Sequence, residues 1–334
     1  MGQIAYDLVE AEKFAQGMEI TQTLHKSASK TNSKAFALQR IAIALATAKQ
    51  FDSALEVVDM LNFESEDENP IVTSGLRSSV LRIIATSQAE AGNIDEALKI
   101  AEPVPIGDRI LVINEVNRAL IKSGETNRAI ELAQSLEQVY IESALGNIAI
   151  ALAEEGQVDE GLEMASSLKE SQQVWVMGGI VEALVEQGKI NQAEELVTSI
   201  PDYPSWALSG FGVKLAQKGE VDKAIEIAES IQDPNREFIL AHVAAFLVEQ
   251  GELARVEEML QPLDERQAST FSNAIFDLAA QEKLAEARQL AQLIPNNPNK
   301  ARALNRLASD YIEAGEKEEA IELLNQALSL IASK

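Results

Sequence analysis

The side chains that most often carry catalysis or bind metals are scarce in this chain of 334 residues. It has no cysteine, which excludes disulfides, thiolate zinc sites and thiol nucleophiles. Its two histidines, His25 and His242, stand too far apart in a repetitive sequence to share a metal ion. No metalloprotease, phosphate-loop, dinucleotide or EF-hand motif occurs. The sequence therefore predicts a protein that is not an enzyme and that uses no cofactor and no metal.

Acidic residues are plentiful, but their spacing follows helix surfaces rather than indicating a catalytic pair. The 53 Asp and Glu residues against 28 Lys and Arg residues give a formal charge of −25. Such a chain is repelled by phosphate backbones and anionic lipids, so we expect no nucleic-acid partner. Apolar runs long enough for a membrane helix are absent, and so is a signal peptide, so we expect no direct membrane insertion. We expect a cytoplasmic protein, or a secreted or periplasmic one if a signal peptide was removed.

The elements that would position any binding residue are indicated by an internal repeat. Over most of the chain, a pivot residue, usually glycine, and a small residue five positions later recur every 31–33 residues. Apolar residues stand eleven, eight and four positions before most pivots, the stripe of an amphipathic helix, and a second stripe follows. Each unit therefore predicts a helix A, a tight turn and a helix B. The pivots are Lys49, Gly92, Gly124, Gly156, Gly188, Gly219, Gly251, Glu282 and Gly315, with a weaker first one at Gly17.

Nine clear units in one register, and a tenth weaker one, predict an all-α solenoid of about nine to ten antiparallel helix hairpins. One hairpin cannot bury its own apolar faces, so stacking on its neighbours must supply the core. We expect a single repeat domain over residues 1–334. The period breaks only between the pivots at 49 and 92, where the acidic segment 62–75 predicts a loop inserted between repeats. A hinge between subdomains is the alternative interpretation of that segment.

The last unit shows the nearest match to a known repeat, in Ala303, Leu304, Leu307, Ala308, Tyr311, Gly315, Ala320 and Ala327. The layout resembles the tetratricopeptide repeat (TPR), whose helix-turn-helix unit has a glycine at the turn and an alanine five residues later. Most other units are shorter than the usual 34 residues and have leucine in place of the tyrosine. The resemblance implies a right-handed superhelical solenoid. It also implies that ligands lie on a concave surface formed by the A helices, at positions thirteen, ten, nine, six and two before the pivot.

Carried onto this sequence, that surface has aromatic residues thirteen positions before three successive pivots, namely Trp175, Trp206 and Phe238. The residues ten and nine positions before the same pivots are Gly178 and Gly179, Ser209 and Gly210, and Ala241 and His242. Large flat side chains beside small residues predict an apolar cleft for a partner. The alternative is structural: the aromatics cover the start of helix A and the glycines permit close packing. His242 is either a hydrogen-bond donor to the partner or an ordinary surface residue.

Arginines and amides flank these aromatics on the same predicted face. On the N-terminal side they are Arg40, Arg82, Asn114, Arg118 and Asn147, and on the C-terminal side Asn273, Arg302, Asn305 and Arg306. Guanidinium and amide groups are suited to hold an extended peptide backbone or its carboxylates. The alternative is a solvated face whose arginines pair with acids such as Glu115.

Two further recurrences concern charge. Glutamates two positions before the pivot, Glu90, Glu154, Glu186, Glu249 and Glu313, suggest an acidic rim. Basic residues fifteen positions before the pivot, Lys34, Arg77, Arg109, Arg236 and Lys300, are expected to pair with acids of the preceding turn.

The leading hypothesis is a non-enzymatic protein–protein interaction scaffold or adaptor that binds a partner peptide or helix in this groove. The alternative is a structural spacer or a self-assembling subunit. No repeat follows the last predicted helix to cover its apolar residues Leu324, Leu328 and Ile331. A homo-oligomer formed through this C-terminal helix is therefore the second hypothesis.

Overall fold

The structure is a computed structural model that describes residues 1–26, 32–61, 70–200, 203–231, 234–260, 270–294 and 298–332. Every regular element within these ranges is an α-helix, which confirms the all-α prediction. The chain forms two compact units, Met1–Val176 and Met177–Lys334, and each is described by itself. The expectation of one continuous domain over residues 1–334 stays a prediction.

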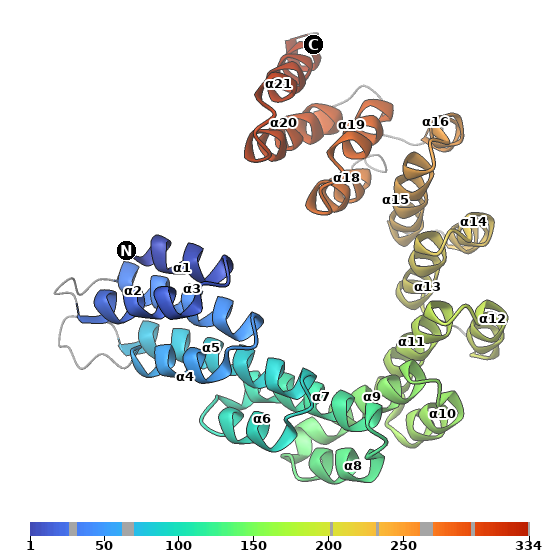
Figure 1. Ribbon diagram of the computed structural model, residues 1–334. Helices are drawn as coiled ribbons and strands as arrows, with labels where there is room; N and C mark the ends of the chain where they lie inside the picture. The colour runs from blue at the N-terminus through green and yellow to red at the C-terminus, as the bar shows by residue number, and fades with distance from the viewer. Residues whose placement is uncertain are drawn as a thin grey trace. The chain divides into compact units, whose positions relative to one another are not determined.

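The N-terminal unit is a stack of five helix hairpins (Figure 1). They are α1 (Gly2–Glu10) with α2 (Phe14–Lys26), α3 (Asn32–Thr47) with α4 (Phe51–Asp59), α5 (Pro70–Glu90) with α6 (Ile94–Ala101), α7 (Ile106–Lys122) with α8 (Thr126–Gln134), and α9 (Gln138–Glu154) with α10 (Val158–Ser167). The A helices α1, α3, α5, α7 and α9 pack against one another in succession, and α2, α4, α6 and α8 each also contact the next A helix. Helix α11 (Glu170–Glu186) carries the chain into the second unit.

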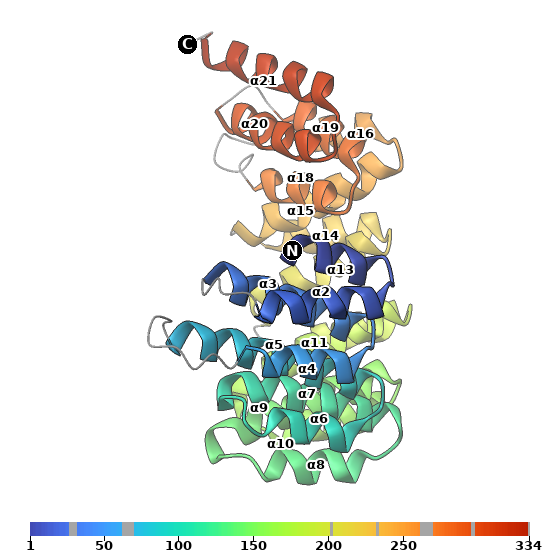
Figure 2. The same cartoon turned by 60° about the vertical axis from the view of Figure 1, so that its left-hand side comes forward.

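The C-terminal unit repeats this arrangement. Its further helices are α12 (Ile190–Ser199), α13 (Ser205–Gln217), α14 (Val221–Ser230), α15 (Pro234–Glu249), α16 (Leu253–Leu260), α18 (Phe271–Ala280), α19 (Leu284–Leu293), α20 (Pro298–Glu313) and α21 (Lys317–Ala332). The A helices α13, α15, α18 and α20 again pack in succession, and Figure 2 shows α15, α18 and α20 one above another. The described helices make ten hairpins, as predicted from the repeat.

Every hairpin turns at one residue with a left-handed backbone. Seven of these residues are glycines, with φ from 74° to 86°, and the others are Glu12, Lys49 and Glu282, with φ of 58°, 58° and 62°. The next backbone N–H donates to the carbonyl oxygen five residues back, for example from Glu125 to Leu120 at 2.8 Å. This bond closes the helix end as a Schellman motif, which requires positive φ and therefore favours glycine.

The first hairpin turns five residues earlier than the sequence pattern predicted. Its pivot is Glu12, and Gly17 lies five residues later in α2, at the position that alanine occupies in most other units. A Cβ on Gly17 would lie 2.8 Å from Val9 Cγ2, so the close approach of α2 to α1 requires a glycine there. The prediction of a pivot at Gly17 was wrong because a glutamate at a turn carries no distinctive sequence signal.

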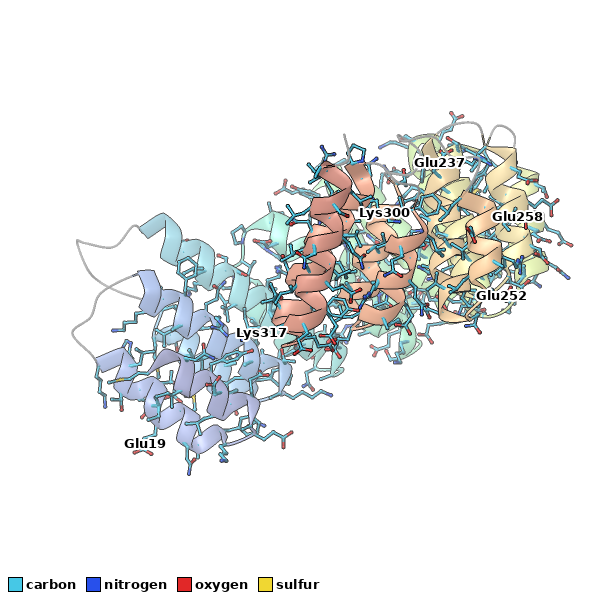
Figure 3. All side chains as sticks on the ribbon, turned by 90° about the horizontal axis from the view of Figure 1, so that it is seen from above. Glu19, Glu237, Glu252, Glu258, Lys300 and Lys317 are labelled. Carbon is cyan, nitrogen blue, oxygen red and sulfur yellow. The ribbon has the colours of Figure 1, made fainter. Side chains whose placement is uncertain are left out.

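Four of the five basic residues near the start of helix A bind carbonyl oxygens at the end of the preceding helix B or just beyond it. The bonds are Lys34 Nζ to His25 O (2.6 Å), Arg77 Nη1 to Val58 O (3.3 Å), Arg109 Nε to Val104 O (3.2 Å) and Lys300 Nζ to Gln292 O (2.5 Å). Figure 3 labels Lys300 on α20. Helix ends leave such carbonyls unpaired and carry partial negative charge. The predicted pairing with an acid of the preceding turn is seen for Arg77, 3.7 Å from Asp59, so helix capping is the more general role.

The predicted acidic loop at 62–75 is only partly testable, because residues 62–69 lie outside the described part of the chain. Helix α5 begins at Pro70, so residues 70–75 are helical and the predicted loop was too long at this end. Proline favours the first turn of a helix, where its missing N–H costs nothing.

Two substitutions with opposite expected effects on the free energy of unfolding test the left-handed turns. No heavy atom lies within 4 Å of a Cβ built on Gly124, so Gly124→Ala changes only the backbone preference. We expect Gly124→Ala to lower the free energy of unfolding by about 1 kcal/mol and Lys49→Gly to raise it by up to about 1 kcal/mol. Denaturant unfolding followed by circular dichroism measures both.

The matched control is Gly107→Ala, which also has open space around its Cβ but lies in α7 without a positive φ. It should stabilise the helix slightly. A loss of stability at Gly107 equal to that at Gly124 would contradict the assigned role of the turn.

Candidate functional site

The three aromatic residues selected from the sequence are exposed near the starts of successive A helices. Trp175 in α11, Trp206 in α13 and Phe238 in α15 have exposed fractions of 39%, 52% and 37%. By contrast, Phe211 and Phe271 are buried. Trp175 belongs to the N-terminal unit, whereas Trp206 and Phe238 belong to the C-terminal unit.

In the N-terminal unit, Trp175 packs on the preceding A helix. A Cβ on Gly146 in α9 would lie 2.9 Å from Trp175 Cζ3, so the ring occupies the space where a side chain is missing. Gly146 was not among the predicted site residues, because it belongs to the unit before those that carry the three aromatics. This contact supports a packing role for part of the Trp175 ring, while the exposed part is accessible to a partner.

Three of the polar residues predicted in this unit, Arg82, Arg118 and Asn147, already have partners within the protein. Arg82 Nε lies 3.7 Å from Asp108 Oδ1, Arg118 pairs with Glu154 and lies 3.7 Å from Glu115, and Asn147 Nδ2 donates to Ser143 O at 3.0 Å. These pairs agree with the alternative of a solvated, paired surface. Exposed ion pairs are worth less than about 1 kcal/mol, so a partner's groups can replace them at little cost.

In the C-terminal unit, Phe238 and His242 form a contact pair on α15. Their ring centroids are 4.7 Å apart in an edge-on arrangement, and His242 Nδ1 lies 2.9 Å from Phe238 O. Because a carbonyl oxygen only accepts, Nδ1 must carry the proton. Nε2 of the neutral ring is therefore the atom that can accept a hydrogen bond.

The small residues of this unit do not leave a simple cleft beneath the aromatics. A Cβ on Gly178 would lie 3.6 Å from Tyr203 Oη, and one on Gly210 would lie 3.0 Å from Glu182 Oε1. Ser209 is buried, and Gly179 is half-buried. Burial, reinforced by the charge of Glu182, raises the pKa of Tyr203 to about 12. The protein's own side chains thus fill part of the predicted apolar space.

An open cleft of about 290 Å³ lies next to His242, between α15 and α18. Its lining includes Gln217, His242, Phe246, Glu249, Asp277 and Lys283. His242 was predicted to lie on this surface and Glu249 on an acidic rim, whereas Gln217 and the lining residues of α18 were not predicted. Gln217 and Glu249 stand two positions before their pivots, where the TPR resemblance also places the ligand surface.

Three of the five recurring glutamates pair with cations of a neighbouring repeat. Glu154 pairs with Arg118, Glu249 with Lys283 at 2.9 Å, and Glu186 with Lys214 at 2.6 Å and with Lys218. Hydrogen bonds from Lys214 and Lys218 lower the pKa of Glu186 to about 2. At these positions the predicted acidic rim is a set of bridges between repeats.

Clusters of metal-ligand residues and long apolar helices are both absent from the part of the chain that the structure describes. No group of three or more His, Cys, Asp or Glu side chains there is arranged to hold a metal ion. Nor does any of its helices combine the length and the apolar character needed to cross a membrane.

A family model described as tetratricopeptide repeat matches residues 278–332, which run from the end of α18 through α21. The matched segment contains two of the ten left-handed turns. The chain is a TPR-like helical repeat protein. The resemblance inferred from the sequence is thereby confirmed. No curated protein sequence matches the chain.

Solved structures similar to this TPR-like protein include Naa15/Naa10 bound to HypK-THB, with 14% identity and a TM-score of 0.30. That alignment covers 100% of this chain and 58% of the matched chain, so this chain spans less than two thirds of it. Ton1535 from Thermococcus onnurineus NA1 has 14% identity and a TM-score of 0.25, covering 98% of both chains. The apo quorum sensor NprR from B. thuringiensis has 13% identity and a TM-score of 0.28, covering 99% of this chain and 97% of that one. Likenesses this distant carry no functional argument.

The bridge at Glu186 predicts a specific dependence of stability on pH. Because the two lysines lower its pKa from 4.5, the stabilisation is complete above about pH 5 and is lost as the pH falls towards 2. We expect Glu186→Gln to lower the melting temperature at pH 7 and to reduce the loss of stability between pH 5 and pH 2. Thermal melts over this pH range provide the measurement.

Glu195→Gln is the matched control, because Glu195 is exposed on α12 and makes no ion pair within the described ranges. Equal acid dependence in the Glu186→Gln variant and the unaltered protein would refute the assignment.

Proposed function

We propose that this TPR-like protein is a non-enzymatic scaffold that binds a segment of a partner protein on the A-helix surface of its C-terminal unit. TPR-like repeats are typically interaction scaffolds without catalytic activity, and the fold supports that general assignment. The finer proposal rests on one observation. Trp206 and Phe238 remain exposed at equivalent positions of two packed helices, and His242, which contacts Phe238, lines an open cleft.

Such a surface offers the two kinds of contact that a bound segment needs. Aromatic side chains bury a large area on binding and lose little conformational entropy, which makes them frequent hot spots. The cleft adds polar groups, including Gln217 and Asp277, that can orient a peptide backbone. The partner that fits is therefore a segment with apolar side chains for Trp206 and Phe238 and with polar backbone or side-chain groups for the cleft.

The remaining predicted site residues extend this proposal into the first unit. Trp175 presents an exposed ring, and Arg82, Arg118 and Asn147 lie on exposed or half-buried positions of the A helices there. Their participation stays a prediction.

Removing both exposed aromatics of the C-terminal unit tests the proposal. A partner is first captured from native lysate on the immobilised chain, identified and purified. We expect the Trp206→Ala/Phe238→Ala variant to bind it at least about 30-fold more weakly, since truncating a hot spot costs at least about 2 kcal/mol. Titration calorimetry measures both dissociation constants.

The control is Phe36→Ala/Leu111→Ala, which removes two similarly exposed apolar side chains from the other unit. Thermal melts confirm that both variants are folded. Undiminished binding by the Trp206→Ala/Phe238→Ala variant would place the partner elsewhere on the protein.

Self-assembly is the second candidate, favoured by the apolar stripe of α21. Ile321, Leu328 and Ile331 are exposed there, and Leu324 is half-buried. If this stripe joins two copies, Leu328→Glu/Ile331→Glu should convert the assembly to a monomer. Analytical ultracentrifugation over a range of concentrations provides the measurement, and a monomer at every concentration of the unaltered chain would rule out self-assembly.

A further inference from the structure

A second cleft, of about 580 Å³, lies between the α18–α19 turn and helix α20 in the C-terminal unit. Its apolar lining includes Phe276, Leu284 and Ala314. Its charged lining consists of four acidic residues and one basic one, a formal charge of −3: Glu282, Asp310, Glu313, Glu316 and Arg306. The cleft therefore combines apolar side chains with a strongly negative charge.

Arg306, the one basic residue that lines this cleft, stacks on an aromatic ring. The guanidinium carbon of Arg306 lies 3.8 Å from the ring centroid of Phe276. Among the described residues, neither Arg306 nor any of the four acids forms an ion pair within 4.0 Å. The stacking shows that the Phe276 ring in this cleft accepts a cationic group on its face, an arrangement that is favourable in itself.

In the cleft next to His242, a lysine of the protein itself pairs with a glutamate of the lining. There, the residue after the pivot is Lys283, and it pairs with Glu249 at 2.9 Å. In the second cleft the corresponding residue after the pivot is Glu316. Two differences therefore separate the clefts: Glu316 stands in place of the lysine, and the counterpart of Glu249 is Ala280, so the lysine–glutamate pair has no equivalent in the second cleft.

Burial acts on one carboxyl group of the cleft, that of Asp310. Burial raises the pKa of Asp310, the charge of Glu313 raises it further, and the charge of Arg306 opposes both effects. A second cation in the cleft would stabilise the ionised carboxylates.

We propose that this cleft binds a lysine or arginine side chain from a basic segment of a partner protein. The methylene groups of such a side chain would pack on Phe276 and Leu284, and its charged end would meet Glu313 and Glu316. The cleft is lined by none of the residues proposed for the aromatic surface at Trp206 and Phe238. The inference therefore does not depend on that proposal.

The test uses the whole chain and short fluorescein-labelled peptides that alternate alanine with lysine, glutamine or glutamate. Fluorescence anisotropy gives their dissociation constants. We expect the lysine peptide to bind and the other two to bind at least about tenfold more weakly. The Glu313→Gln/Glu316→Lys variant, which copies Lys283 of the preceding cleft, should weaken binding of the lysine peptide by at least about tenfold.

The matched control is Glu257→Gln/Glu258→Lys, which makes the same change in net charge on exposed residues of α16 (Figure 3). It should change binding by less than about twofold, because exposed charges at a distance are screened by salt. Equal weakening in both variants would mean that the acidic surface as a whole attracts the peptide, and that result would overturn the inference. So would a failure of the chain to prefer lysine over glutamine.

A second pair of variants is expected to change the affinity for the lysine peptide in the opposite direction. Arg306→Gln removes the competing cation from the cleft and should strengthen binding of the lysine peptide, whereas Arg302→Gln, at an exposed position of the same helix, should leave it nearly unchanged. Thermal melts of all variants establish that they are folded. Equal effects of Arg306→Gln and Arg302→Gln would also contradict the proposed site.

Discussion

The structure depends on one backbone hydrogen bond that recurs in every hairpin. The N–H after the left-handed residue donates to the carbonyl oxygen five residues earlier, which ends helix A and directs the chain back along it as helix B. The bond sets the register of both apolar stripes, and so it determines which side chains meet in the core. It tolerates Glu12, Lys49 and Glu282 at the left-handed position because packing on both sides of the turn outweighs a local cost of about 1–2 kcal/mol.

A repeated turn also produces repeated surface positions. Because successive A helices pack directly against each other, residues at the same distance from their pivots lie side by side within a unit. Trp206 and Phe238 form such a pair, and the clefts next to His242 and Arg306 are two versions of one position in successive repeats. Substitutions that leave the core unchanged can therefore alter one cleft at a time, as Lys283 and Glu316 illustrate.

The polar contacts show where one repeat depends on the next. Glutamates near the ends of the A helices suggested an acidic rim, yet Glu186 binds two lysines of the following A helix. Basic residues near the starts of the A helices cap the preceding B helices, as Arg77 does at Val58. Both kinds of contact join residues that come close only when neighbouring helices stack. The sequence pattern of one helix therefore does not identify the residue on the next helix that it binds.

The sequence by itself determined the helix hairpins, their period and nearly all of their turns, because helix periodicity and glycine preference are local properties of the chain. It also placed Trp206, Phe238 and His242 on an exposed face of the A helices. Only the tertiary structure decided that Glu12 makes the first turn, that Tyr203 fills the space beside Gly178, and that open clefts lie farther along the stack. The physical reason is that the volume and charge of a cleft depend on side chains from two helices, whose sizes and pairings are set only when the repeats pack.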